Sequence, residues 1–271
     1  MTFSIVGRLG NALGVAVASK FLSVGSAVPA AAAEIGALAT QAYANLNYRT
    51  QGLTLLRTGV SAADTVAGLT AADPERAARQ VGVVAATGDG ATFTGSECHA
   101  WAGGVAGDGY AIQGNILVGP EVVDAMQAAW LSADGPLAAR LLAALTAGDD
   151  AGGDRRGRQS AALLVVERGG GYGGTSDVAV DLRVDDHPAP IEEMTRLLRL
   201  HKFYFGKPDP ATLLDLSGDL ASEVELRLTR LGYADLESWA GVENLEERIV
   251  PRQIDPLVLE HLRSHSGVDQ A

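Results

Sequence analysis

The stretch that decides the fold is Thr2-Phe-Ser-Ile-Val-Gly7, which is followed after Gly10-Asn11 by Ala12-Leu-Gly-Val-Ala-Val-Ala18. Both apolar segments have the length and composition of short β-strands. Glycine and asparagine tolerate the positive φ angles that a tight turn needs, so the pair between the segments predicts a β-hairpin. The chain is therefore expected to open with two antiparallel strands, and Thr2 begins the first of them.

Outward from this hairpin, the order of the predicted elements disfavours a parallel βαβ sheet. The strands expected are 35–41, 80–86, 91–94, 109–113, 160–167 and 178–184, and the helices are 43–57, 61–72, one that begins at Pro120, 136–147 and 188–202. Helices come in pairs between groups of strands rather than alternating with single strands. This order predicts an α+β fold of the αββα type, a four-layer sandwich in which helices cover two packed antiparallel sheets.

A change of composition near Gly206-Lys-Pro-Asp-Pro210 predicts a stiff, exposed linker. We expect a first domain at 1–205, a linker at 206–212 and a second domain at 213–271. Apolar residues recur at helical spacing in the last segment, at Leu220, Val224, Leu228 and Leu231. Gly232 is well placed to end that helix, so the second domain is expected to be small and α-helical.

Composition limits the classes of partner. The chain has 21 Lys and Arg residues against 33 Asp and Glu residues, a formal net charge of −12. Nucleic acids and anionic membranes attract basic surfaces, so neither is an expected partner. The single cysteine, Cys98, fits a reducing compartment, and a cytoplasmic location is expected. The alternative is export on an apolar N-terminal signal, which internal glycines and Lys20 disfavour.

Thr2 is the candidate nucleophile. A threonine hydroxyl needs a base, and when threonine is the first residue its own α-amino group, with a pKa near ~7.7–8.0, can supply one. Removal of Met1 would give Thr2 this role. The hairpin is expected to bring Lys20 beside Thr2, where an ammonium would lower the proton affinity of the amine. The alternatives are an ordinary Met-Thr start and a lysine on the surface.

Several blocks of sequence resemble the DUF1028 family, in the family's order and over residues 1–205. They are Thr2-Phe-Ser-Ile-Val, Val15-Ala-Val-Ala-Ser-Lys20-Phe, Ala39-Thr-Gln-Ala-Tyr43, Gln113-Gly-Asn-Ile-Leu-Val-Gly119, Gly152 to Ala161 and Val180 to His187. These proteins are placed in the N-terminal nucleophile (Ntn) hydrolase superfamily, so the resemblance implies an αββα fold and catalysis by Thr2. The segment 213–265 resembles the peptidoglycan-binding-like module attached to some of them.

The opening hairpin is also similar to that of proteasome β-subunits, with one departure. Ala18 stands where those proteins have an aspartate. Lys20 or Asp154 is expected to take over the role of that aspartate. The departure also favours the alternative of a non-catalytic protein on the same fold.

Two motifs supply the other candidate site residues. Asn115, with backbone N–H groups beside a glycine, can form an oxyanion hole, or it can simply hold a turn. In the loop 152–160, Asp154 can hold the amine of Thr2, and Arg155 or Arg158 can clamp a substrate carboxylate. The alternative is a solvated loop with internal salt bridges. The remaining predicted substrate-binding residues are Ser19, Gln113, Gln159 and Ser160.

Three further patterns are interpreted as structural. The glycines of 169–174 lack the Lys-Ser/Thr ending of a P-loop and predict a hairpin turn. Cys98 and His99 are adjacent, but no other residue reinforces a thiol catalyst, so a half-buried structural pair is expected. His261 and His265 lie four residues apart on a predicted helix, but the sequence shows no third ligand, so no metal site is expected.

The leading interpretation is an amide hydrolase that needs no cofactor and acts on a small polar substrate with a carboxylate. Thr2 attacks the carbonyl, its amine moves the proton, and Asn115 stabilises the oxyanion. The alternative is a protein that binds a small molecule or a cell-wall fragment without catalysis. A homodimer is expected.

Overall fold

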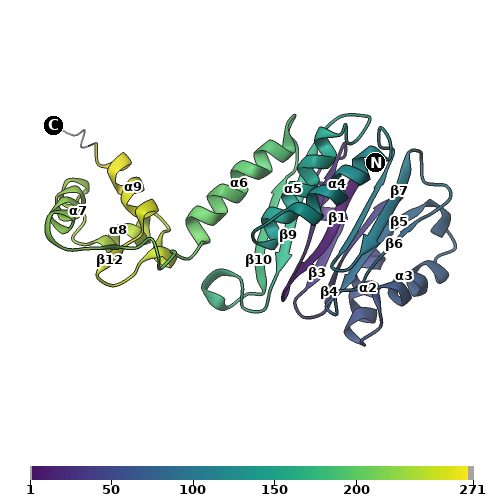
Figure 1. Ribbon diagram of the computed structural model, residues 1–271, viewed down its shortest axis with the longest axis horizontal. Helices are drawn as coiled ribbons and strands as arrows, with labels where there is room; N and C mark the ends of the chain where they lie inside the picture. Colours follow the sequence, from purple (N-terminus) through teal and green to yellow (C-terminus); the bar gives the residue numbers. More distant parts are fainter. Residues whose placement is uncertain (1, 268–271) are drawn as a thin grey trace. The chain divides into compact units, whose positions relative to one another are not determined.

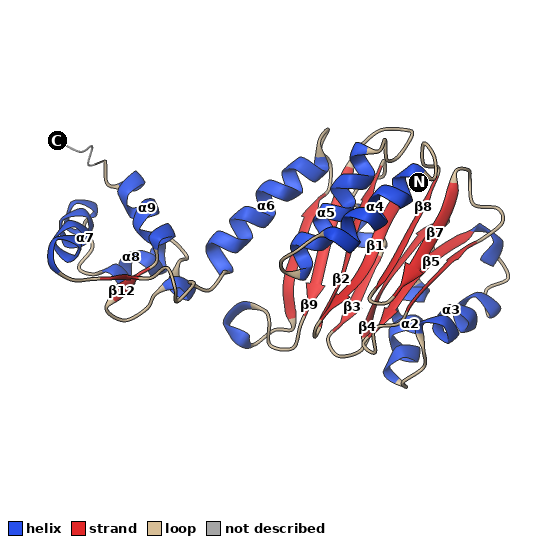
Figure 2. Ribbon diagram, viewed as in Figure 1, coloured by secondary structure: helices blue, strands red, loops and turns tan. Residues whose placement is uncertain are grey.

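The computed structural model describes residues 2–267, which divide into two compact units between Leu197 and Leu198 (Figure 1). The first unit holds two antiparallel sheets (Figure 2). The six-stranded sheet has the order β10 (Val178–Val184), β9 (Ser160–Val166), β2 (Ala12–Ser19), β1 (Thr2–Leu9), β8 (Tyr110–Asn115) and β7 (Ala102–Gly107). The four-stranded sheet has the order β3 (Pro29–Ala32), β4 (Gly36–Ala42), β5 (Arg79–Ala85) and β6 (Gly90–Thr94).

Helices pack on the outer faces of the two sheets. Helices α4 (Glu121–Ser132) and α5 (Leu137–Asp150) cover the six-stranded sheet, and α2 (Asn47–Arg57) and α3 (Ala62–Ala71) cover the four-stranded sheet. Shorter or flanking elements are α1 (Val24–Ala27), η1 (Arg76–Ala78), η2 (Tyr172–Gly174) and α6 (Pro190–Phe205). The expected mixed fold with antiparallel sheets and paired helices is thereby confirmed.

The opening hairpin forms as the sequence predicts. Leu9 pairs with Ala12, which leaves Gly10 and Asn11 as a two-residue turn, and Gly10 has the positive φ (60°) that this turn requires. β1 lies between β2 and β8, so both of its edges are paired and Thr2 is held opposite Asn115. The first residue of the strand is therefore fixed by the sheet itself.

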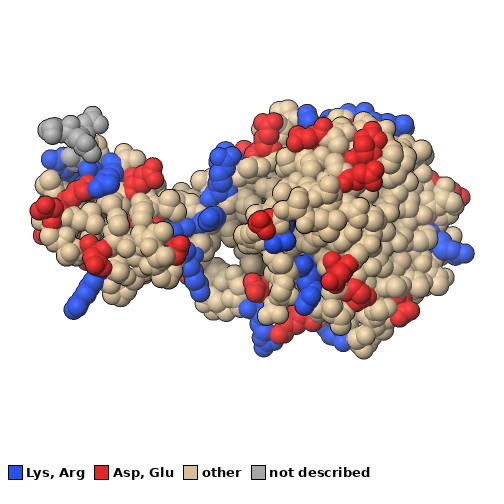
Figure 3. All heavy atoms as spheres, in the orientation of Figure 1, with Lys and Arg blue, Asp and Glu red and all other residues tan. Residues whose placement is uncertain are grey.

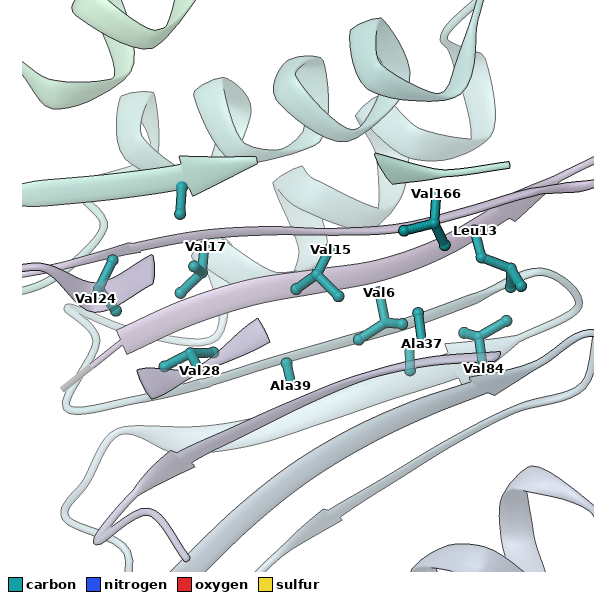
Figure 4. Close-up of a cluster of buried hydrophobic side chains, with 12 residues drawn as sticks. Val6, Leu13, Val15, Val17, Val24, Val28, Ala37, Ala39, Val84 and Val166 are labelled. Carbon is teal, nitrogen blue, oxygen red and sulfur yellow. The ribbon is translucent and has the colours of Figure 1, made fainter. Parts of the chain in front are cut away.

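The core between the sheets is formed by every second side chain of the strands, because successive side chains point to opposite faces of a sheet. Val6, Val15 and Val17 project from the six-stranded sheet toward Ala37 and Ala39 of β4 (Figure 4). Because side chains two apart share a face, the same inward face continues from these apolar residues into polar ones at one end. Those polar residues are Thr2 and Ser4 on β1, Ser19 on β2, Gln41 on β4, Gln80 on β5, and Gln113 and Asn115 on β8.

Two strands of the first unit, β3 and β7, are not predicted from the sequence. Pro29–Ala32 and Ala102–Gly107 consist almost wholly of alanine and glycine, which have low β-propensity and give no alternating pattern. Each is an edge strand, paired to β4 or to β8. Tertiary pairing rather than local preference therefore makes them strands.

The second unit is small and largely helical, as expected. It contains β11 (Leu214–Asp215), α7 (Gly218–Leu231), α8 (Leu236–Val242), η3 (Glu246–Arg248), β12 (Gln253–Ile254) and α9 (Pro256–His265). Gly232 ends α7 with a φ of 84°, as the sequence predicts. Its core is built by Val224, Leu228, Trp239, Leu259 and Leu262, among others.

The division between the units falls inside α6 rather than at the expected linker after 205. Phe203 and Tyr204, near the end of that helix, pack against the core of the second unit. Buried Arg248 pairs with Asp255 and donates hydrogen bonds to the backbone carbonyls of Phe203 and Lys202. The last turns of α6 therefore belong to the second unit; of the expected second domain, 268–271 lie outside the described residues.

Charged side chains of both signs are interspersed on the face shown in Figure 3. Within residues 2–267, no helix combines the length and the hydropathy needed to cross a membrane.

Candidate functional site

Thr2 lines a pocket of about 400 Å³. The residue is 5% exposed, and its Oγ1 lies 3.2 Å from Oγ of Ser19, at the end of β2. The backbone carbonyl of Thr2 accepts a hydrogen bond from Nε2 of Gln41 (3.3 Å). The sheet and these contacts hold Thr2 in place beside the cavity.

The walls of this Thr2 pocket are mainly apolar. Phe21, Val24, Val28, Tyr43 and Leu46 line it, together with three alanines, Gln41 and Arg79. Phe21 and Tyr43 are more than half exposed, so they form the rim. An apolar cavity with a few polar groups at its base is typical of a small-molecule site.

The cation in this pocket is Arg79, which the sequence reasoning missed. Its Nε donates to Oδ2 of Asp73 (3.0 Å), Nη1 donates to the Tyr43 carbonyl (2.6 Å), and Nη2 pairs with Glu75. Burial opposes the charge of Asp73, but hydrogen bonds from Asn45 and Arg79 outweigh it and hold the pKa of Asp73 well below its usual range. The charge of Arg79 is therefore balanced by Asp73 and Glu75, and its side chain holds the backbone of Tyr43 at the pocket rim.

A layer of buried amide side chains is hydrogen-bonded to the backbone of Thr2 through Gln41. Oε1 of Gln80 accepts hydrogen bonds from Nε2 of Gln41 and from Nδ2 of Asn115, both at 2.8 Å, and its Nε2 donates to the Gly114 carbonyl (2.7 Å). Gln113, predicted to bind substrate, instead donates to Oγ of Ser4 (2.6 Å) and is fully buried in this layer. The layer links both sheets and holds the groups beside Thr2 in one arrangement.

Asn115 lines a second pocket, of about 310 Å³, together with His99, Ile116 and Arg156. Ala42 and Tyr43 line both pockets, so the two adjoin. Ala42 and Ile116 have positive φ angles (65° and 53°), and such non-glycine conformations cost of order 1–3 kcal/mol each. Residues with strained backbone therefore line both pockets, which is a further sign of a functional site.

Cys98 and His99, interpreted as a structural pair, also lie at this second pocket. The thiol of Cys98 contacts the Arg79 carbonyl (3.3 Å), and burial raises the pKa of this thiol. The His99 ring packs against Tyr43, with ring centroids 6.0 Å apart. A raised thiol pKa disfavours a thiolate nucleophile, so these residues are interpreted as part of the pocket wall.

Asp154 contacts different groups from those expected. The sequence reasoning assigned it to the Thr2 amine, but its carboxylate accepts hydrogen bonds from the Lys20 backbone N–H (2.8 Å) and the Arg156 backbone N–H (2.9 Å), and it pairs with the Arg156 guanidinium (3.2 Å). Asp154 is 6% exposed. It therefore ties the end of β2 to the arginine-rich loop.

Lys20 also differs from its expected position. Its side chain is exposed, and Nζ lies 3.4 Å from the Arg158 carbonyl oxygen. The backbone N–H of Lys20, rather than its ammonium, contacts the buried carboxylate of Asp154. The placement corresponds to the alternative of a surface lysine.

The arginine-rich loop divides its residues between the surface and the pocket walls. Arg158 pairs with Asp149 (2.8 Å), and Gln159 donates to Asp186 (3.1 Å). Arg155 is exposed. The neighbour that reaches the second pocket is Arg156, which the sequence did not distinguish from the other two arginines.

Ser160, another predicted substrate contact, is buried and hydrogen-bonds two residues that line the Thr2 pocket. Its hydroxyl donates to the Phe21 carbonyl and accepts from the Val24 N–H (3.1 Å). It therefore holds two residues of the pocket wall rather than facing the cavity.

Comparison with known proteins gives a family for both parts of the chain. The family model described as "Family of unknown function (DUF1028)" matches residues 2–194. The model described as "Putative peptidoglycan binding domain" matches residues 204–262. No sequence among the curated proteins matches the chain.

A solved structure of the same family supports the assignment. The crystal structure of protein SPO2555 from Silicibacter pomeroyi is 31% identical in sequence and superimposes with a TM-score of 0.68. The match covers 82% of this chain and 92% of that one. The chain therefore belongs to the DUF1028 family and carries, after the DUF1028 region, a segment that matches the peptidoglycan-binding-like family.

Proposed function

We propose that the first unit is an Ntn-type hydrolase that cleaves an amide bond with Thr2, once removal of Met1 has freed its amine. Met1 lies outside the described residues. The observation that carries the proposal is the position of Thr2, a buried strand end that lines a 400 Å³ pocket and is hydrogen-bonded to a layer of buried amides. Helices on the outer faces of two packed sheets are also the architecture expected of that superfamily.

The residues around Thr2 suit each step of such a reaction. The free amine of Thr2 takes the proton of Oγ1, directly or through a water, as Oγ1 attacks the substrate carbonyl. Ser19, 3.2 Å from Oγ1, orients the hydroxyl. The amide nitrogen of the substrate leaves with the proton, and water then hydrolyses the acyl ester on Thr2.

Asn115 is the donor best placed for the oxyanion. It lies opposite Thr2 in the sheet and lines the adjoining pocket. Its Nδ2 carries two protons, and Gln80 accepts a hydrogen bond from this nitrogen. The second proton is available to an oxyanion, and the first fixes the orientation of the side chain.

The two pockets suggest how a substrate is divided between them. The apolar Thr2 pocket suits a compact apolar acyl group, and the second pocket, with His99, Asn115 and Arg156, suits a polar leaving group. Arg156 is the arginine we assign to a substrate carboxylate, in place of Arg155 and Arg158. N-acyl amino acids have both features.

Hydrolysis of a panel of N-acyl amino acids, followed by release of the free amine, tests the proposal. Thr2→Ala should lower kcat by about a thousandfold or more, whereas Thr2→Ser should keep measurable activity. Thr54→Ala, on the exposed side of α2, is the matched control and should behave as wild type. Equal rates for wild type and Thr2→Ala would rule out Thr2 as the nucleophile.

A second candidate is a protein that binds a cell-wall fragment without catalysis. The match of residues 204–262 to a peptidoglycan-binding family favours it, as does alanine at position 18. It predicts that soluble muropeptides bind the full chain with equal affinity before and after Thr2→Ala. Calorimetric titration of both variants distinguishes this candidate from the hydrolase.

A further inference from the structure

Three metal-binding side chains converge in the second unit, far along the sequence from Thr2. His261 and His265 lie one turn apart on α9, and Glu243 directly follows α8. One ligand atom of each lies within 4.8 Å of the others. The sequence showed the two histidines but not Glu243, because the fold rather than the spacing brings the carboxylate to them.

The separation of His261 and Glu243 fits a shared metal ion. Nε2 of His261 lies 3.1 Å from Oε2 of Glu243. Two ligands of a tetrahedral zinc, each about 2.0–2.2 Å from the metal, lie roughly 3.3 Å from one another. The present distance also suits a hydrogen bond, so the third ligand is what distinguishes the two arrangements.

His265 has the hydrogen bonding that is usual for a metal ligand. Its Nδ1 lies 2.9 Å from the backbone carbonyl oxygen of His261. A carbonyl only accepts hydrogen bonds, so Nδ1 carries the proton of the neutral ring, and Nε2 keeps the lone pair that a metal binds. A backbone carbonyl on the second ring nitrogen is a common outer partner of metal-bound histidine.

The surroundings hold the cluster in place. The His261 ring packs against Phe203 and Trp239, with ring centroids 5.1 and 5.8 Å away, and its side chain is 17% exposed. His265 is exposed, so its side chain can turn toward a metal without repacking the core. One wall is thus rigid, and the open side admits an ion and water.

We propose that Glu243, His261 and His265 bind a zinc-class divalent metal ion, with water as the fourth ligand. Two imidazoles and one carboxylate suit zinc, whereas magnesium and calcium prefer sites made wholly of oxygen ligands. The ion would join α9 to the residue after α8 and so stabilise the second unit. The site is independent of the proposed hydrolase.

Titration of the untagged, chelator-treated full chain with zinc, in competition with a chromophoric chelator, tests this site. We expect one zinc per chain and a cobalt(II) spectrum of tetrahedral intensity. His265→Gln and Glu243→Gln should each weaken zinc binding about tenfold or more. His187→Gln, an exposed histidine in the first unit, is the matched control and should leave zinc binding unchanged.

Two results would overturn the proposal. The first is a wild-type chain that does not compete with the chelator for zinc, which would leave Glu243 and His261 as a plain hydrogen-bonded pair. The second is equal zinc binding by wild type and His265→Gln, with the circular dichroism of both unchanged, which would place any bound zinc elsewhere. Because His265 is exposed, misfolding of that variant is not expected.

Discussion

Replacing Gln80 with leucine should destabilise the first unit by about 1–3 kcal/mol. Leucine is close to glutamine in volume, so the substitution removes hydrogen bonds and leaves little cavity. The Gln80 side chain is fully buried and is hydrogen-bonded to Gln41, Thr94, Asn115 and two backbone carbonyls. The loss of stability should therefore arise from a buried polar group left without a hydrogen-bond partner rather than from lost packing.

The magnitude follows from the partners that remain. Asn115 loses the acceptor of its amide, whereas Gln41 keeps longer contacts to the Thr2 and Gln113 carbonyls (both 3.3 Å). A buried polar group left without a partner costs about 1–3 kcal/mol, and the Asn115 amide is such a group, which gives the range above. For a unit of this size the melting temperature should fall by roughly 2–12 °C.

Differential scanning calorimetry of the full chain measures the shift, and hydrogen exchange of β1, β4 and β8 assigns it to the first unit. Gln51→Leu, the same substitution at an exposed position of α2, is the matched control and should change stability by less than about 0.5 kcal/mol. If both variants melted like wild type, the amide layer would not support Thr2 as described.

Three further predictions concern other parts of the chain. The hydrogen bond from Arg263 lowers the pKa of Glu223 to about 2. The stabilisation of the second unit by ionised Glu223 is therefore complete above pH ~4.3 and is lost as the pH falls toward 2. Glu223→Gln should flatten this pH dependence in unfolding experiments. Gly82→Ala should lower the melting temperature of the first unit, because a Cβ there would lie 1.9 Å from Oε1 of Gln113. Burial raises the pKa of Cys98, so its alkylation by iodoacetamide should reach half its maximal rate above pH ~8.5.

Each of these predictions has a control or a contrary result. If the Glu223→Gln variant lost stability at low pH as wild type does, Glu223 would not be the cause of the pH dependence. Gly68→Ala, at an exposed helical glycine with only ordinary contacts, should stabilise slightly or have no effect, in contrast to Gly82→Ala. A Cys98 thiol that reacts fully at pH 7 would contradict the effect of burial.

The sequence predicts much of the fold because its strong signals are local. Gly10-Asn11 predicts the hairpin, and Gly232 predicts a helix end, since each depends on the φ angle of one or two residues. The edge strands β3 and β7 were missed, because alanine and glycine carry no alternating pattern. The division inside α6 was also missed, since it depends on where Phe203 packs.

The candidate site was predicted less completely, because its residues come from separate strands. Thr2 and Asn115 are brought together as expected, but Lys20 and Asp154 make other contacts. Gln41 could have been found, since it continues the inward alternation of Ala37 and Ala39. Arg79 and Arg156 could not have been singled out, because nothing local distinguishes an arginine that lines a pocket from one on the surface.

Whether Thr2 is the nucleophile is tested by the mass of the purified chain before and after treatment with an electrophilic β-lactone. We predict a chain that lacks Met1 and gains a single acyl group, which peptide mapping places on Thr2. The Thr2→Ala chain should gain none. A chain that keeps Met1 while hydrolysing N-acyl amino acids, or an acyl group on another residue, would show that Thr2 with a free amine is not the nucleophile.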